Sequence, residues 1–226
     1  MTGRAGGSMR FRDRKEAGEL LAAQLVHLQS RRPVVLALPR GGVAVGYEIA
    51  RRLGAPLDIV LVRKIGVPWQ PELALGAVAD GGAPEIFIDG TMKEALAIPE
   101  EYVREETARQ LAELERRRLV YCAGRPAVAV EGRAAIVVDD GIATGATMRV
   151  ALRAVRKRGP AWLVLAAPVA APETLASFAG EADETVCVEA AKGLGAIGFY
   201  YDDFHQMADD EVTDLLARAA TLGAPK

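Results

Sequence analysis

The sequence predicts a doubly wound α/β fold, in which helices flank a mainly parallel sheet. Short continuous apolar runs, typical of strands buried on both faces, occur at Val34–Leu38, Leu57–Val62 and Arg133–Val138. Segments with apolar residues every three to four positions separate these runs, as amphipathic helices do. Because strands that alternate with helices imply parallel βαβ units, the 226 residues fit one such domain.

The first predicted helix begins after Asp13, which forms a capping-box variant with Glu16. Its apolar face comprises Ala17, Leu20, Leu21, Leu25 and Leu28. A turn at Pro39–Gly42 then leads into a second helix over Val43–Leu53, and Gly54 ends that helix.

The middle of the chain predicts a loop at Ile65–Glu72, followed by short strands at Leu75–Ala79 and Glu85–Ile88 with a turn at Asp80–Gly82. A long charged helix over Pro99–Val120 follows, and its narrow apolar stripe indicates packing or a dimer contact. The remaining predicted elements are Val128–Val130, Arg133–Val138, Gly145–Arg158, Trp162–Ala167, Pro172–Phe178, Thr185–Val188 and Asp209–Ala219.

The chain reads as one domain over residues 9–226, preceded by a flexible leader at 1–8. A helical insertion is expected at about 90–125, and a small C-terminal hood at about 189–206 precedes the last helix.

Composition excludes several classes of protein. The net charge of -2 argues against a nucleic-acid binder, and no apolar run reaches the length of a membrane span. Two cysteines and two histidines exclude a disulfide framework and a cysteine-rich zinc site. The sequence also holds no G-x-S-x-G, which argues against a serine hydrolase. These features predict a soluble, cytoplasmic protein.

The segment Ile136–Thr147 carries the chemistry. A buried strand ends in two carboxylates, Asp139 and Asp140, and a loop of small residues leads into a helix. Open parallel sheets bind ligands at this edge, where backbone N–H groups and the hydroxyls of Thr144 and Thr147 form an anion cradle. Carboxylates repel a phosphate, so the two acids face vicinal hydroxyls or a hydrated Mg²⁺. Either half alone is common in ordinary turns, but the two together predict a sugar-phosphate site.

The string VVDDGIATGAT, which ends at Thr147, resembles the phosphoribosyl-pyrophosphate (PRPP) signature of type I phosphoribosyltransferases. The resemblance implies that Asp139 and Asp140 hold the ribose 2′ and 3′ hydroxyls and contact Mg²⁺ through water. The loop around the 5′-phosphate would comprise Ala143, Thr144, Gly145, Ala146 and Thr147.

A second segment is similar to the pyrophosphate loop of that family. It comprises Pro39, Arg40, Gly41 and Gly42. Gly41 and Gly42 permit unusual backbone dihedrals, and Arg40 offers a charged fork to phosphate oxygens. An ordinary strand–helix turn has the same composition, so this segment supports the resemblance only in combination with the string that ends at Thr147.

Arg63 and Lys64 match the basic residues that follow the second strand in the family, where they would neutralise pyrophosphate. An exposed pair of basic residues on the surface is the alternative. The expected catalytic residues are Arg40, Lys64, Asp139 and Asp140.

The predicted hood is rich in aromatic residues. Phe199, Tyr200 or Tyr201 is expected to stack on a planar base, or else to anchor the tail to the core. Ala143 occupies a position where enzymes for 6-oxopurines carry an acid, which disfavours hypoxanthine and guanine.

The resemblance therefore implies an Mg²⁺-dependent phosphoribosyltransferase that uses PRPP and a nucleobase-like acceptor, with a homodimer typical of relatives. The alternative is a PRPP- or nucleotide-sensing regulator without catalysis on the same fold.

Overall fold

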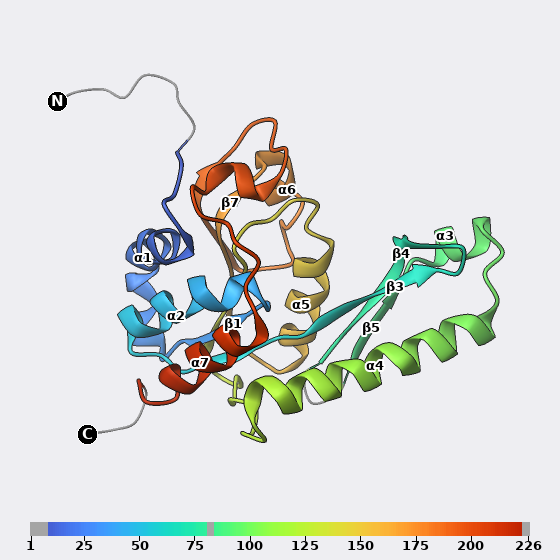
Figure 1. Ribbon diagram of the computed structural model, residues 1–226, viewed down its shortest axis with the longest axis horizontal. Coiled ribbons are helices and arrows are strands. Elements are labelled where there is room, and N and C mark those ends of the chain that lie inside the picture. Colours follow the sequence, from blue (N-terminus) through green and yellow to red (C-terminus); the bar gives the residue numbers. More distant parts are fainter. Residues whose placement is uncertain (1–8, 81–83, 223–226) are drawn as a thin grey trace.

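The computed structural model describes residues 9–80 and 84–222, and its main body is built on a five-stranded parallel sheet (Figure 1). The strands lie in the order β2-β1-β6-β7-β8. They are β1 (Val34–Ala37), β2 (Leu57–Ile59), β6 (Ala134–Val138), β7 (Trp162–Ala170) and β8 (Glu184–Ala190). The expected leader at 1–8 and the residues 81–82 of the expected turn lie outside the described residues.

Helices cover both faces of this sheet, which confirms the predicted fold class. They are α1 (Arg14–Gln24), α2 (Gly41–Leu53), α5 (Ala146–Lys157), α6 (Pro172–Ala176) and α7 (Asp209–Ala219). Alternate strand residues point to opposite faces. Val35 and Ala37 pack with α1, α2 and α7, whereas Val34 and Leu36 pack with α5.

An arm extends from the body (Figure 1). It consists of an antiparallel sheet, β3 (Val62–Val67), β4 (Gln70–Ala79) and β5 (Glu85–Ile88), with α3 (Gly90–Ala95) and α4 (Glu100–Cys122). The prediction of a loop at Ile65–Glu72 is wrong, because Ile65 and Val67 are buried and pair with β4 to form a hairpin that turns at Pro68–Trp69. The predicted strand at Val128–Val130 does not form.

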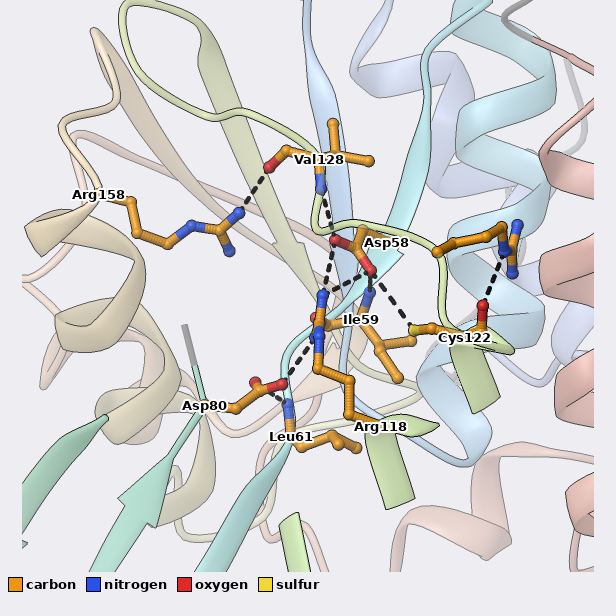
Figure 2. A network of polar contacts seen from close by, with 9 residues as sticks. Asp58, Ile59, Leu61, Asp80, Arg118, Cys122, Val128 and Arg158 are labelled. Atoms are coloured by element: carbon orange, nitrogen blue, oxygen red, sulfur yellow. Dashed lines mark hydrogen bonds and ion pairs between the residues drawn. The ribbon is translucent and has the colours of Figure 1, made fainter. Parts of the chain in front are cut away.

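A buried polar network fastens α4 to the body (Figure 2). Asp58, 6% exposed, lies 3.1 Å from the Arg118 guanidinium and accepts a 2.9 Å hydrogen bond from the backbone N–H of Val128. Arg118 also pairs with Asp80 at 2.6 Å. The long helix therefore packs as an integral part of the fold. No helix in the described part of the chain, α4 included, is long and apolar enough to cross a membrane.

Candidate functional site

The loop between β6 and α5 lies at the carboxyl end of the parallel sheet, and a backbone hydrogen bond attaches it to the neighbouring strand β7. The N–H of Ile142 donates to the carbonyl of Val169 at 2.9 Å. Gly145 begins the α5 helix with a φ of 78°, and a Cβ there would lie 2.7 Å from the Phe178 ring. Only glycine fits this position. No side chain of the described residues caps α5, so its first N–H groups remain available to an anion.

Thr144 and Ala146 are exposed in this loop and Thr147 is half-buried. The structure therefore brings the expected phosphate-loop residues together at an accessible helix N-terminus, as the sequence predicted.

Asp139 and Asp140 follow β6 at the same edge, and each already uses one carboxylate oxygen within the protein. Asp139 Oδ1 accepts a 2.8 Å hydrogen bond from the Asp140 backbone N–H, and Asp140 Oδ2 lies 2.7 Å from Arg14 Nε. Burial, followed by the neighbouring Asp140 carboxylate, raises the pKa of Asp139 well above its ordinary value. Burial also raises the pKa of Asp140, and the Arg14 guanidinium opposes that shift.

Sequence reasoning missed Arg14, which is 8% exposed. A signal was present in its position, since Arg14 precedes Ala17, Leu21 and Leu25 at helical spacing and thus lies on the buried face of α1. Nothing in the sequence indicates its partner, because Asp140 is 126 residues away.

The Pro39–Gly42 segment, with a cis peptide bond between Pro39 and Arg40, runs against the two carboxylates. A Cβ on Gly41 would lie 1.8 Å from Asp140 Oδ2. Neither Gly41 nor Gly42 has a positive φ, so the unusual backbone of this loop lies at the cis bond before Arg40 and not at the two glycines. The glycines permit close approach of backbone to carboxylate.

Arg40 lies at this loop, but in this structure its nearest ionic partner is a helix terminus. Arg40 Nη1 is 3.9 Å from Asp209 Oδ1, and Asp209 begins α7. Tyr121 donates a 2.6 Å hydrogen bond to the same carboxylate oxygen. Arg40 is thus part of the Pro39–Gly42 loop, and the Asp209 carboxylate partly balances its positive charge.

Arg63 and Lys64 point to opposite faces of β3, because neighbouring strand residues alternate. Lys64 is exposed and lines a cavity of about 280 Å³ together with Thr144 and Thr147. Arg63 instead donates a 2.9 Å hydrogen bond to Gln110 on α4. Lys64 therefore lies beside the loop at 143–147, whereas Arg63 faces α4, so the expectation that both basic residues face one site is wrong.

The hood crosses above the motif. A Cβ on Gly141 would lie 2.4 Å from Ile197, which places the hood directly over the loop. Phe199 is 73% exposed and Tyr200 is half-buried, whereas Tyr201 is buried and its hydroxyl donates to the Asp140 carbonyl at 2.6 Å. Tyr201 is therefore not available to stack on a base, and its role is to anchor the tail.

Comparisons with known proteins agree with this geometry. Residues 12–189 match the family described as phosphoribosyl transferase domain. "Putative phosphoribosyl transferase Rv0571c" of Mycobacterium tuberculosis strain H37Rv is 44% identical over 212 residues, which cover 92% of this chain and 47% of that protein. "Putative phosphoribosyl transferase MT0597" of Mycobacterium tuberculosis strain CDC 1551 has the same identity and coverage. The chain thus spans about half the length of the curated relatives it matches.

The crystal structure of the protein TT1426 from Thermus thermophilus has a TM-score of 0.79 and 45% identity to this chain. The match covers 93% of this chain and 99% of the other. With a family match over residues 12–189, most of its length, the chain belongs to the phosphoribosyl transferase domain family.

Proposed function

We propose that this domain transfers ribose 5-phosphate from PRPP to a nitrogenous base and releases pyrophosphate. The observation that carries the proposal is one sheet edge at which Asp139 and Asp140 lie between two loops that we propose to bind anions. One segment is the loop at 143–147 with the α5 N-terminus, and the other is the loop at 39–42. On such an edge the 5′-phosphate of PRPP would lie at the loop at 143–147, the ribose diol at the two carboxylates, and the pyrophosphate at the loop at 39–42.

The proposed reaction needs positioning rather than a covalent intermediate. The bond from C1′ to the pyrophosphate oxygen breaks, and its electron pair leaves with pyrophosphate. A nitrogen of the base then bonds C1′ and gives its proton to solvent. Backbone N–H groups of the α5 N-terminus hold the 5′-phosphate and the carboxylates hold the diol. Lys64, which lines a cavity with Thr144 and Thr147, is proposed to extend from there toward the departing pyrophosphate. Preorganised groups of this kind supply several kcal/mol of barrier reduction.

Magnesium is proposed as part of the substrate. Within residues 9–80 and 84–222, no group of three or more His, Cys, Asp or Glu residues is placed to hold a metal ion. Asp140 is already paired with Arg14. The residues therefore do not fit a resident metal centre. We propose that Mg²⁺ enters on the pyrophosphate of PRPP and contacts Asp139 and Asp140 only through water.

The acceptor is proposed to be a planar base that stacks on Phe199 or Tyr200. Phe199 is 73% exposed on the hood above the motif, so its ring is available to a ligand. Exposed Ala143 offers no acid to a purine, which supports a base other than hypoxanthine or guanine.

A second candidate function is PRPP binding without turnover. It is supported by the position of Arg40, whose guanidinium lies 3.9 Å from Asp209. Part of the Arg40 charge is therefore balanced within the protein and is not directed at a leaving pyrophosphate.

The proposal is tested in two steps. Thermal unfolding is followed with PRPP and Mg²⁺, and a ligand at 100 times its Kd adds about 2.7 kcal/mol of stability. Pyrophosphate release is then measured with a panel of purine and pyrimidine bases. Release with one base supports transfer, and stabilisation without release from any base supports the sensor. Absence of stabilisation by PRPP contradicts both.

A further inference from the structure

We infer that Arg14 is a positioning residue of the sugar-phosphate site: it holds Asp140 by Oδ2 and thereby reserves Oδ1 for a ligand hydroxyl. This inference rests on the proposed function, because it assigns a role in binding the ribose diol. Nothing in the sequence motif or in the family comparison assigns this role to Arg14.

Three contacts fix the Arg14 guanidinium in a nearly buried position. Its Nε lies 2.7 Å from Asp140 Oδ2, and its Nη1 donates a 2.9 Å hydrogen bond to the carbonyl of His205. Its planar group also lies 4.0 Å from the centre of the Phe204 ring. An arginine held by an ion pair, a carbonyl and an aromatic face has little rotamer freedom. Asp140 is consequently held against a rigid partner.

The glycines of the Pro39–Gly42 segment lie next to the carboxylate oxygens that already accept hydrogen bonds from other groups of the protein. A Cβ on Gly41 would meet Asp140 Oδ2, and one on Gly42 would come within 3.2 Å of Asp139 Oδ1. These are the two oxygens that accept from Arg14 and from the Asp140 backbone N–H.

Apart from an interaction between the two carboxyl groups themselves, the opposite oxygens, Asp139 Oδ2 and Asp140 Oδ1, have no hydrogen-bond partner in the described part of the chain. Each carboxylate therefore keeps one oxygen, and two acceptor oxygens match the two hydroxyls of a vicinal diol.

The positive charge of Arg14 has a second effect on this site. Two neighbouring carboxylates near a phosphate loop repel each other and the ligand. A buried guanidinium against Asp140 offsets one of the two negative charges without occupying the ligand side. Arg14 thus links three parts of the site: α1, the motif and the hood, which it reaches at His205 and Phe204.

The test is a double-mutant cycle on the full chain, with ribose 5-phosphate and sulfate as probes. Four proteins are compared: the parent, Arg14→Met, Asp140→Asn and the double variant. Lys15→Met is the matched control, because Lys15 is the exposed neighbour of Arg14 on α1. Affinities come from calorimetric titration, and the free energy of unfolding of each variant is measured separately without ligand.

Arg14→Met is expected to weaken ribose 5-phosphate by about 10-fold or more, the loss of about one well-placed charge-assisted hydrogen bond. Sulfate, which has no diol, is expected to change by no more than about 3-fold, within half a hydrogen bond. In the Asp140→Asn background the same substitution is expected to have no further effect, because Arg14 acts through Asp140. Arg14→Lys retains the charge but has only one nitrogen, so it is expected to restore part of the affinity.

The outcomes separate the inference from the proposed function. If the parent binds neither ribose 5-phosphate nor PRPP, both are overturned. If the parent binds and Arg14→Met binds equally well, only the inference fails. Equal losses in the parent and Asp140→Asn backgrounds also overturn it, since Arg14 would then act independently of Asp140. Should Arg14→Met fail to fold, the same comparison is made with Arg14→Lys, and unchanged affinity overturns the inference.

Discussion

The hydroxyl of Tyr201 donates a 2.6 Å hydrogen bond to the backbone carbonyl of Asp140, which joins the hood to the acidic end of the motif. The Tyr201 ring packs between Phe11 and Phe204, with centroid distances of 5.3 Å and 4.9 Å. Burial raises the pKa of the Tyr201 hydroxyl, so it remains a donor at neutral pH. The hood is therefore positioned by the same residue that carries a site carboxylate.

Tyr201→Phe is expected to lower the free energy of unfolding by about 1 kcal/mol, because the part-buried hydrogen bond to the Asp140 carbonyl is lost while the ring still fits. Urea denaturation measures this change. Phe199→Leu is the matched control on the same segment, and its exposed side chain is expected to change stability by no more than about 0.5 kcal/mol. Equal effects of the two substitutions would contradict the anchoring role of Tyr201.

Lys64→Ala is expected to weaken PRPP by about 10-fold, the loss of one charge-assisted contact, and to affect ribose 5-phosphate much less. The physical reason is that Lys64 is proposed to extend from the cavity it shares with Thr144 and Thr147 toward the pyrophosphate, which only PRPP carries; an equal loss for both ligands would assign Lys64 to the 5′-phosphate instead. Competition titrations with the two ligands measure the difference. Arg63→Ala is the control, because Arg63 lies on the α4 face of β3 and bonds Gln110. A loss of PRPP affinity in Arg63→Ala as large as in Lys64→Ala would refute this assignment of the two faces.

Arg118→Met is expected to destabilise the protein by about 3–5 kcal/mol, because it leaves the carboxylates of Asp58 and Asp80 without their cation. Both acids are at the base of α4 in the network of Figure 2. Arg116→Met, an exposed change on the same helix, is expected to cost no more than about 1 kcal/mol. Chemical denaturation of both variants decides the matter, and similar small costs would show that the network does not hold α4.

His205 gives the hood a pH-dependent contribution to stability. Hydrogen bonds to Glu211 and Asp203 raise the pKa of His205 above its ordinary value of 6.5. The stabilisation is therefore present in full below about pH 6.5 and is lost as the pH rises through the folded-state value above it. Because the imidazole is half-exposed, the effect is small.

The measurement is the Tm of the parent and of His205→Asn at pH 6 and pH 9. The parent is expected to be the more stable of the two at pH 6, and the difference is expected to shrink at pH 9. A difference that is the same at both values would show that the ion pairs of His205 contribute nothing.

The parts of the site that were predictable are those contiguous in sequence. Asp139, Asp140 and the loop to Thr147 form one string, and the order of apolar strand, acids and small residues determines their local structure. The parallel sheet was predictable for the same reason, since each buried strand is a continuous apolar run.

The parts that were not predictable depend on tertiary contacts. Arg14 and Asp140 are 126 residues apart. The separation of Arg63 from Lys64 depended on recognising β3 as a strand, and Gly66 and Pro68 obscured it by their turn-like composition. Burial of Tyr201 rather than Phe199 follows from the Phe11 bridge, which pairs the two ends of the chain.

The most direct test of the sugar-phosphate site is the binding of ribose 5-phosphate and sulfate to the parent, Asp139→Asn and Thr147→Val. Asp139→Asn retains the carbonyl oxygen that accepts from the Asp140 backbone N–H, so the loop is expected to keep its fold. At a pH high enough to ionise Asp139, whose pKa is raised by burial, ribose 5-phosphate is expected to bind Asp139→Asn about 10–150-fold more weakly, since charge-assisted hydrogen bonds are worth about 1.5–3 kcal/mol. Sulfate is expected to bind this variant as well as the parent or better, and Thr147→Val is expected to weaken both ligands. Equal losses of sulfate and ribose 5-phosphate in Asp139→Asn would contradict the account, because the carboxylate would then maintain the loop rather than recognise the ribose.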